Sequence, residues 1–302
     1  MDPSSSGKDR MYSPKAVAHA IGVSESSLKR WCDAGKIAAV KTAGGHRRMN
    51  QSSVISFIRD RSKYDLLDPT SIGLPDLSEF TVSDRADAAA QYHSGLVSEA
   101  EGRCHRLLIY LYINGWKVEE IVDHVVAVAF KQIGTQWQHG SLEIYQERRA
   151  CEICLEALSR LKAILDSPLP NALTAIGGTI ENDHYTLCTK AIEVTLISHG
   201  WQAKSLGSNL PFASLLQAAM TMRPNLFWLS VSFIEDEDSF IRDLNEMAEQ
   251  IPRSTTLVFG GNAITQGILP KIRNAVYCDN LAQLVEVTQR IDLAASPDRT
   301  PG

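Results

Sequence analysis

Residues 173–200 read LTAIGGTIENDHYTLCTKAIEVTLISHG and combine two periodicities. The apolar run 173–180 is long enough for one buried strand, and after a polar break the apolar residues recur at helical spacing. His184 therefore lies between a strand and a helix, at the edge where open α/β sheets bind ligands. Its imidazole has two interpretations. It caps the helix or bonds a loop carbonyl, or it is a metal ligand whose far nitrogen is oriented by Asp183 or Glu181.

The chain after this stretch repeats the alternation of strand and helix, which predicts a doubly wound α/β domain over residues 167–295. Ser230 and Ser232 end the third strand, and Gly260 and Gly261 end the fourth. A hydroxyl there can bond a ligand, and glycine lets the backbone approach one closely. The plain alternatives are a satisfied core hydroxyl and a tight turn. Strands are expected at 173–179, 202–206, 226–232, 255–259 and 275–278, and helices at 185–198, 212–222, 236–250 and 281–291.

This arrangement of strand, D-x-H-x-x-G-like loop, helix, serine-bearing strand and Gly-Gly loop resembles the cobalamin-binding Rossmann domain. The resemblance implies a flavodoxin-like sheet and a cobalamin whose cobalt is ligated from below by His184, which displaces the cofactor's own base. The E-x-x-H spacing from Glu181 to His184 is similar to that of light-sensing MerR-type repressors of the CarH/LitR kind. Leu187 stands at the family glycine, where a side chain would intrude towards the corrin or its tail. Gly207 and Leu210 resemble the loop that lines the corrin edge.

Composition limits the alternatives. A chain of 302 residues is long enough for two or three domains, and 44 % hydrophobic residues is ordinary for a globular protein. The sequence has no apolar run of membrane-spanning length, its first ten residues are too polar for a signal peptide, and its six cysteines are scattered. We therefore expect a cytoplasmic protein that does not contact a membrane. Cys151 and Cys154 form one C-x-x-C on a helical face, either as small core residues or as a metal or redox pair.

Charge is distributed unevenly along the chain. Residues 1–63 hold 12 Lys and Arg against 5 Asp and Glu, a net charge of +7. The remaining residues carry a net charge of −12, which completes the overall −5. A basic first module on an acidic body predicts a polyanionic partner for the first module only.

Residues 1–63 predict a winged helix-turn-helix after an irregular lead. Ser13-Pro14 supplies an N-cap and a first helical proline, and Ser24 caps a second helix that Gly35 stops. Residues 36–49 predict a hairpin wing with Gly44-Gly45 at its tip, followed by a closing helix over 51–61. The outward positions are Ser26, Ser27, Lys29 and Arg30 on the second helix, and Lys41, Thr42, His46, Arg47 and Arg48 on the wing.

These outward residues form either a solvated basic surface or a DNA interface, and phosphate contacts with major-groove insertion suit this pattern. The runs V-A-x-x-I-G-V-S-x-x-S-L-K-R-W-x-x-x-G-K-I from Val17 and T-x-G-G-H-R-R-M from Thr42 resemble the MerR winged-helix signature. This resemblance implies that the protein binds a double-stranded DNA operator as a homo-oligomer, with contacts in symmetric sets.

Residues 64–82 contain prolines and glycine and predict a linker. Residues 83–166 are helical throughout, with breaks at Gly95, Asn114-Gly115 and His139-Gly140, and predict a four-helix bundle whose last helix starts near Ser141. Residues 296–302 are a tail.

Trp137 taken alone is a core residue. However, I-G-x-x-W-x-x-G from Ile133, followed by Glu147, resembles the bundle signature of the cobalamin-dependent light sensors, where the Trp covers the upper face of the cofactor. The family has a Glu-His pair where this chain has Glu147 and Arg148. Arginine has no lone pair for cobalt, so it can hydrogen-bond an upper ligand or Glu147. His139 is the nearby candidate substitute.

Three functions remain open at this stage. The first is a transcription factor, a repressor, controlled by adenosylcobalamin held between bundle and Rossmann domain, with light changing its oligomeric state between tetramer and smaller forms. The second is a MerR-type regulator without cobalamin, or one responding to another flat tetrapyrrole. The third, a corrinoid methyl-transfer protein, is disfavoured by the DNA-binding module. No Ser/His/Asp arrangement, P-loop or zinc spacing indicates catalysis, so we expect no enzyme activity.

Overall fold

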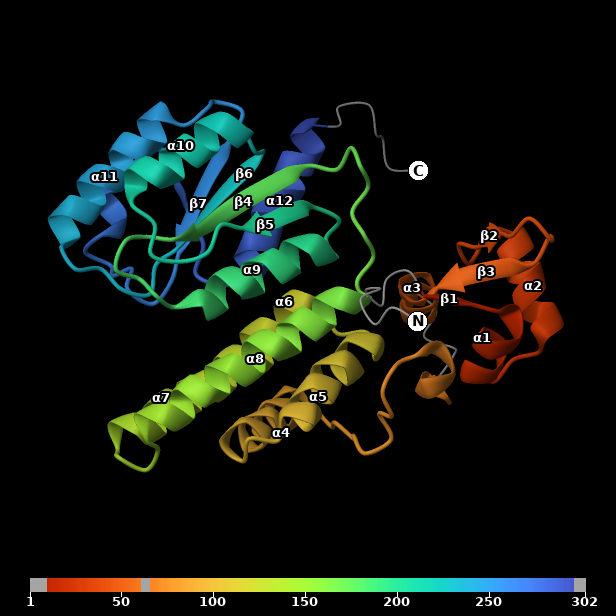
Figure 1. Ribbon diagram of the computed structural model, residues 1–302. Helices are drawn as coiled ribbons and strands as arrows, with labels where there is room; N and C mark the ends of the chain where they lie inside the picture. Colours follow the sequence, from red (N-terminus) through yellow and green to blue (C-terminus); the bar gives the residue numbers. More distant parts are fainter. Residues whose placement is uncertain (1–9, 61–65, 296–302) are drawn as a thin grey trace. The chain divides into compact units, whose positions relative to one another are not determined.

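The computed structural model describes residues 10–60 and 66–295. The chain divides into two compact units, residues 1–166 and 167–302. In Figure 1 the first unit runs from β1 to α8 and the second from β4 to α12. The predicted tail, residues 296–302, lies outside the described residues.

The first module is a small helical domain with a three-stranded sheet. Helix α1 (Pro14–Ala20) begins at Ser13, whose hydroxyl accepts from the Ala16 amide, and α2 (Glu25–Asp33) begins in the same way at Ser24. Helix α3 (Gln51–Asp60) closes the module, and its Phe57 ring lies 5.3 Å from that of Trp31. Both N-caps were predicted from the sequence because Ser and the helical apolar pattern coincide there.

The wing is the antiparallel pair β2 (Val40–Lys41) and β3 (Arg47–Asn50). Its tip is closed by hydrogen bonds within residues 42–46, where Gly45 has φ of +77°. Strand β1 (Met11–Tyr12) pairs with the other side of β3, giving the order β1-β3-β2. The expectation of an irregular lead was therefore wrong for residues 11 and 12, which pair too briefly to leave a sequence pattern.

Residues 66–80, which we call the strap, lie in the segment predicted as a linker. A turn of 3-10 helix, η2 (Pro69–Ile72), is capped by Asp68, and Ile72 and Leu74 are buried. The backbone amides of Leu67 and Asp68 both donate to the Ala20 carbonyl, at 2.8 and 3.0 Å. The strap thus packs on the end of α1.

Residues 85–164 are mostly helical: α4 (Arg85–Val97), α5 (Glu101–Ile113), α6 (Val118–Ile121), the π-helical η3 (Val122–Val126), α7 (Ala127–Gln138) and α8 (Ile144–Ile164). The elements α6, η3 and α7 follow one another without a break. Gly95, predicted as a break, lies inside α4. A Cβ there would be 2.7 Å from the Cys104 sulfur, so the glycine allows two helices to approach closely.

The second unit is a parallel α/β domain. Its sheet contains β4 (Thr174–Thr179), β5 (Gln202–Ser205), β6 (Leu226–Ser230), β7 (Thr256–Gly260) and β8 (Val276–Tyr277) in the order β5-β4-β6-β7-β8, all paired in parallel. This is the flavodoxin-like strand order. From β4 the chain adds β5 on one side and then β6 to β8 on the other, so the direction of winding reverses beside β4. The expected doubly wound fold is confirmed, and the strand bounds differ from the predicted ones by one or two residues.

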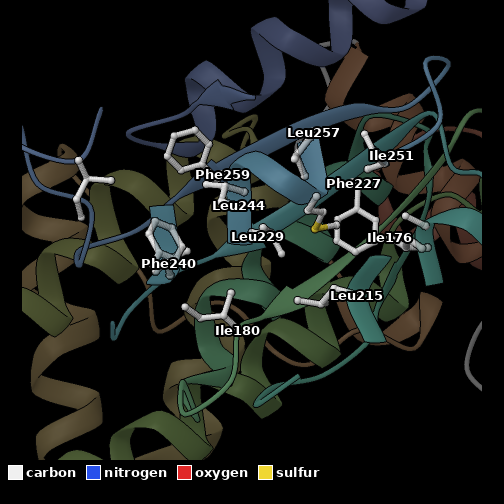
Figure 2. Close-up of a cluster of buried hydrophobic side chains, with 14 residues drawn as sticks. Ile176, Ile180, Leu215, Phe227, Leu229, Phe240, Leu244, Ile251, Leu257 and Phe259 are labelled. Atoms are coloured by element: carbon white, nitrogen blue, oxygen red, sulfur yellow. The ribbon is translucent and has the colours of Figure 1, made fainter. Parts of the chain in front are cut away.

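Helices α9 (Thr186–Ser198), α10 (Phe212–Met222), α11 (Glu237–Gln250) and α12 (Leu281–Ala295) cover the two faces of the sheet. Alternate strand residues point to opposite faces, and they separate into two cores. Phe227, Leu229 and Phe259 face α10 and α11 in the larger core, which Figure 2 shows in close-up. Trp228 and Val258 face α9 and α12 in the smaller one. The edge at the carboxyl ends of the strands is left to the loops.

Within residues 10–60 and 66–295, no helix has both the length and the apolar composition needed to cross a membrane.

Candidate functional site

The loop after β4 is tied to the loop after β5 at the carboxyl edge of the sheet. The buried Thr179 hydroxyl donates to the Asp183 carbonyl at 2.5 Å and accepts from the Asn209 amide at 3.0 Å. The Asn209 side chain in turn accepts from the Asn182 amide at 2.8 Å. Asn182 and Asn209 both have left-handed backbones, with φ of +64° and +58°, which asparagine tolerates better than most residues. The loop that carries His184 therefore has a fixed conformation.

Asp183 fixes the same loop to the end of β6. Its side chain is only 1 % exposed, and the carboxylate accepts from the backbone amides of Tyr185 at 3.0 Å and Ser232 at 2.5 Å. In the part of the chain that the structure describes, no hydrogen bond joins Asp183 to the His184 ring, so the expected orientation of the far nitrogen by Asp183 stays a prediction. The bonds that the carboxylate does make hold the loop.

His184 is exposed, and among the described residues no hydrogen bond or ion pair engages its ring. Glu181, the other candidate for orienting it, is exposed as well. An exposed imidazole on a rigid loop can offer a ring nitrogen to a metal that arrives with a ligand. The interpretation of His184 as a helix cap has no support, because α9 has no side-chain cap hydrogen bond and its N-cap residue is Tyr185.

The first turn of α9 packs against the end of β6. Leu187 is 5 % exposed and Ser230 is 2 % exposed. Burial raises the pKa of the Cys188 thiol, and hydrogen bonds with the Ser230 and Ser232 hydroxyls lower it in part. The two serines predicted as ligand contacts therefore already interact with Cys188. Nothing in the sequence pattern singled out Cys188, because its partners lie more than 40 positions away.

A polar chain continues below this turn. The Trp228 indole donates to the Thr189 hydroxyl at 2.9 Å, which lies 3.2 Å from the Ser205 hydroxyl. Ser205 accepts from the Gly207 amide at 3.1 Å. Because Trp228 and Thr189 are buried, these bonds hold α9, β6 and the loop after β5 together without leaving polar atoms unpaired.

The glycines predicted to let a ligand approach fall into two classes. A Cβ at Gly260 would be 2.1 Å from the Cys278 carbonyl oxygen, and one at Gly261 would be 2.3 Å from that of Val231. These two glycines are needed for contacts between backbone segments, which accounts for them without a ligand; their predicted ligand contacts stay a prediction. At Gly207, with φ of +97°, a Cβ would meet no atom within 4 Å. Gly207 alone faces open space at this edge.

In the first unit the candidate residues lie around the turn between α7 and α8. Trp137 is 49 % exposed, so it is not a core residue, and His139, the C-cap of α7, is also exposed. Ile144 and Tyr145 at the start of α8 are exposed too, at 60 % and 66 %. Large apolar side chains that remain exposed close together in sequence mark a surface that binds something.

Glu147 is held by its neighbours on α8. The Arg148 guanidinium lies 3.4 Å from one carboxylate oxygen, and the Cys151 thiol donates to the other at 3.4 Å. Arg148 is 68 % exposed, so the pair is screened by water and adds little stability. Arg148 therefore contacts Glu147, which is one of the two roles expected for it. Cys151 and Cys154 are buried, and neither forms a disulfide.

On α2, Arg30 is exposed, and no hydrogen bond or ion pair of the described residues engages it. Lys29 forms an exposed ion pair with Glu25 at 2.7 Å, and Ser27 bonds the capping Ser24. The other predicted contacts, Ser26 on α2 and Lys41, Thr42 and His46 on the wing, are exposed, and Arg48 on β3 is half-buried.

Arg47 differs from its neighbours. Its guanidinium bonds both carboxylate oxygens of Asp33 on α2, at 2.6 and 2.8 Å. This bidentate pair links the wing to the end of α2. Arg47 therefore holds the wing in place in this structure, and its predicted DNA contact would have to compete with Asp33.

Comparison with known proteins identifies the first module and the fold of the rest. A model of the helix-turn-helix domain family matches residues 11–62. No curated protein matches the chain.

A solved structure, the monomethylamine corrinoid protein of Methanosarcina barkeri, resembles this chain with a TM-score of 0.58 and 16 % identity. The match covers 69 % of this chain and 100 % of that one. At this identity the likeness shows the fold. A cobalamin-binding protein from Desulfitobacterium hafniense matches with 17 % identity over 68 % of this chain and 98 % of that one. The methanol:cobalamin methyltransferase complex of M. barkeri matches with 15 % identity over 71 % of this chain and 82 % of that one. Both TM-scores are 0.37, too low to show a shared fold.

Proposed function

We propose that this protein is a DNA-binding transcriptional regulator whose operator affinity is controlled by a cobalamin-type corrinoid. One observation carries the proposal: a rigid loop presents the exposed, unpaired His184 at the ligand-binding edge of a domain with a corrinoid-protein fold. The same chain carries a helix-turn-helix domain. That combination fits a sensor in which ligand and DNA bind to different modules.

The residues at this edge fit the axial side of such a ligand. A bound cobalamin would supply a cobalt ion that accepts an imidazole and a metal–carbon bond that light can break. His184 offers the imidazole, and the bonds of Thr179 and Asp183 hold its loop in place before binding. Because the loop is already ordered, binding costs little conformational entropy.

The helices of the first unit would supply the other side. They would form the four-helix bundle expected from the sequence, with the exposed Trp137 as a contact to the ring. Glu147 and Arg148 would face the upper ligand as a pair, Arg148 as a hydrogen-bond donor. His139, exposed beside Trp137, is the residue that can give a lone pair there.

The first module would bind its operator in the MerR manner, with α2 in the major groove and the wing on the phosphates. Arg30, Lys41 and His46 are the exposed basic residues available for this. We propose that the protein is a repressor, and that the adenosylcobalamin form assembles into dimers or tetramers that light dissociates. Assembly would raise operator affinity because linked modules bind DNA with a high effective concentration.

A corrinoid methyl-transfer protein is the alternative function for a chain with this fold. We propose that this chain is a regulator and not an enzyme of that kind. The helix-turn-helix domain favours a regulator. A regulator that responds to a different tetrapyrrole is the second candidate, and the burial of Leu187 favours it.

The test is an absorption spectrum of the full chain mixed in darkness with adenosylcobalamin or, in parallel, adenosylcobinamide, and then desalted and illuminated. Retention of either corrinoid, lost in His184→Ala, would support the proposal. A light-dependent change in both the spectrum and the gel-filtration volume would support light control. If neither corrinoid is retained, the corrinoid part of the proposal is wrong. A gel-shift titration with operator DNA, with and without the retained corrinoid, tests the regulatory part.

A further inference from the structure

The protein fills the space beside His184 with its own side chains. Leu187 in the first turn of α9 is 5 % exposed, and Ser230 at the end of β6 is 2 % exposed. The Cys188 thiol, whose pKa burial raises, lies close to the Ser230 and Ser232 hydroxyls. The end of β6 is thus covered by the first turn of α9.

The next contact between α9 and β6, at Thr189 and Trp228, is closed as well. The Trp228 indole and the Thr189 hydroxyl are bonded at 2.9 Å, and both residues are buried between α9 and the sheet. The Asp183 carboxylate accepts one bond from the Ser232 amide after β6 and one from the Tyr185 amide within the loop itself. Opening a slot here would break several buried hydrogen bonds and expose apolar surface.

The outer part of the same edge is different. His184 is exposed, and a Cβ at Gly207 would contact no atom within 4 Å. A flat molecule can therefore lie against the edge and reach the imidazole. A bulky substituent that projects from this molecule towards α9 and β6 finds no space, because Leu187 fills it.

Cobalamin carries such a group. Its nucleotide tail leaves from the lower side of the ring, and when an imidazole of the protein takes the lower position on the metal, the tail has to be accommodated on that side. A heterocyclic base with its sugar and phosphate is much larger than the space that a single leucine occupies.

We propose that the His184 site selects a flat, metal-centred tetrapyrrole without a nucleotide tail, and that Leu187 is the residue that excludes the tail. The ligand is a tail-free corrinoid of the cobinamide type, with a planar ring and a metal that accepts one imidazole; haem shares this chemistry and belongs to the second candidate. This inference rests on the proposed function and replaces its cobalamin with a corrinoid that lacks the tail. Asp183 and Cys188 hold the closed arrangement, and Leu187 fills it.

The experiment is a spectrophotometric titration of the full chain, in darkness, with aquacobalamin, diaquacobinamide and haemin. The wild type should bind cobinamide about 100-fold more tightly than cobalamin, and tighter binding of haem than of cobinamide would favour the second candidate. His184→Ala should weaken the preferred ligand at least about tenfold and remove the spectral shift of imidazole ligation.

Aquacobalamin also has to release its own base from the metal, which disfavours it at any histidine site. Leu187→Gly and Leu187→Ala separate this effect from exclusion, because the cost of release belongs to the ligand and is the same for every variant. Both variants should raise cobalamin affinity about tenfold while cobinamide affinity stays within about twofold. Leu187→Ala retains helix propensity, so it keeps the test valid where glycine loosens α9.

The outcomes are distinct. Equal affinity of the wild type for cobalamin and cobinamide, or no gain of cobalamin affinity in either Leu187 variant, would overturn the selection and leave the proposed function intact. If none of the three ligands binds, the proposed function itself fails.

Discussion

Replacing Asp183 with alanine tests whether the loop of His184 is held from within. The carboxylate is buried and accepts two backbone hydrogen bonds, from Tyr185 and Ser232. A hydrogen bond to a charged group contributes about 1.5–3 kcal/mol to stability. A buried backbone amide that loses its acceptor also carries a desolvation penalty, which is smaller where water can reach it. Taking partial hydration of both amides into account, we expect Asp183→Ala to destabilise the loop by about 2–4 kcal/mol.

The assay is hydrogen exchange of the native protein, read by mass spectrometry on peptides that contain Tyr185 and Ser232. A loss of about 2–4 kcal/mol corresponds to exchange roughly 30- to 700-fold faster at these two amides. Asp183→Asn keeps one strong acceptor, so its exchange rates should lie between those of the wild type and of Asp183→Ala. The matched control is Asp236→Ala, which removes an exposed N-cap of α11 that bonds the Ser239 amide at 3.0 Å. The control should loosen only the start of α11 and leave the exchange of Tyr185 unchanged.

Exchange in Asp183→Ala within about twofold of wild type at both amides would refute the reasoning. It would mean that Asn209 and Thr179 hold the loop without the carboxylate, and His184 would then owe its position to the loop after β5 alone.

Three further predictions concern other parts of the chain. Arg30→Ala should lower operator affinity and reduce the slope of log affinity against log salt by about 0.9, whereas Arg253→Ala in the second unit should leave both unchanged; an unaltered slope for Arg30→Ala would mean that it touches no phosphate. Gly261→Ala should cost more in urea unfolding than Gly207→Ala, because its Cβ would lie 2.3 Å from a backbone oxygen whereas Gly207→Ala adds only left-handed strain of about 1–2 kcal/mol; equal costs would contradict the two classes of glycine. Burial raises the pKa of Cys104 from 9.0 to about 12. The neutral thiol therefore contributes stability that is fully present below pH 9 and is lost as the pH rises towards 12. Over this range the free energy of unfolding should fall more steeply for the wild type than for Cys104→Ala, and parallel curves would contradict the raised pKa.

The sheet of the second unit was predictable because its signals are local. Each strand is a short apolar run bounded by polar residues, and each helix has an apolar face, so the alternation survives in the sequence without knowledge of the partners. The position of His184 at the carboxyl edge follows from this alternation and the parallel topology.

The details of the site were not predictable because they depend on residues distant in sequence. Asp183 bonds Ser232, and Thr189 bonds Trp228, across separations of 49 and 39 positions. A sequence pattern shows that a carboxylate follows a strand but not which donors it meets, so Asp183 was assigned to the ring of His184. Arg47 is a similar case, because only the fold brings Asp33 to it.

The strap has a consequence for how the DNA-binding module could be transferred to another protein. The family match ends at residue 62, but Ile72 and Leu74 are buried, and Gln51 of α3 donates to the Ile72 carbonyl at 2.7 Å. A fragment cut at the end of the match would lose these contacts and expose the end of α1. We therefore expect that the transferable unit extends to about residue 80, and that grafts made with the shorter segment would bind DNA weakly because the module is incompletely folded and not because they lack recognition residues.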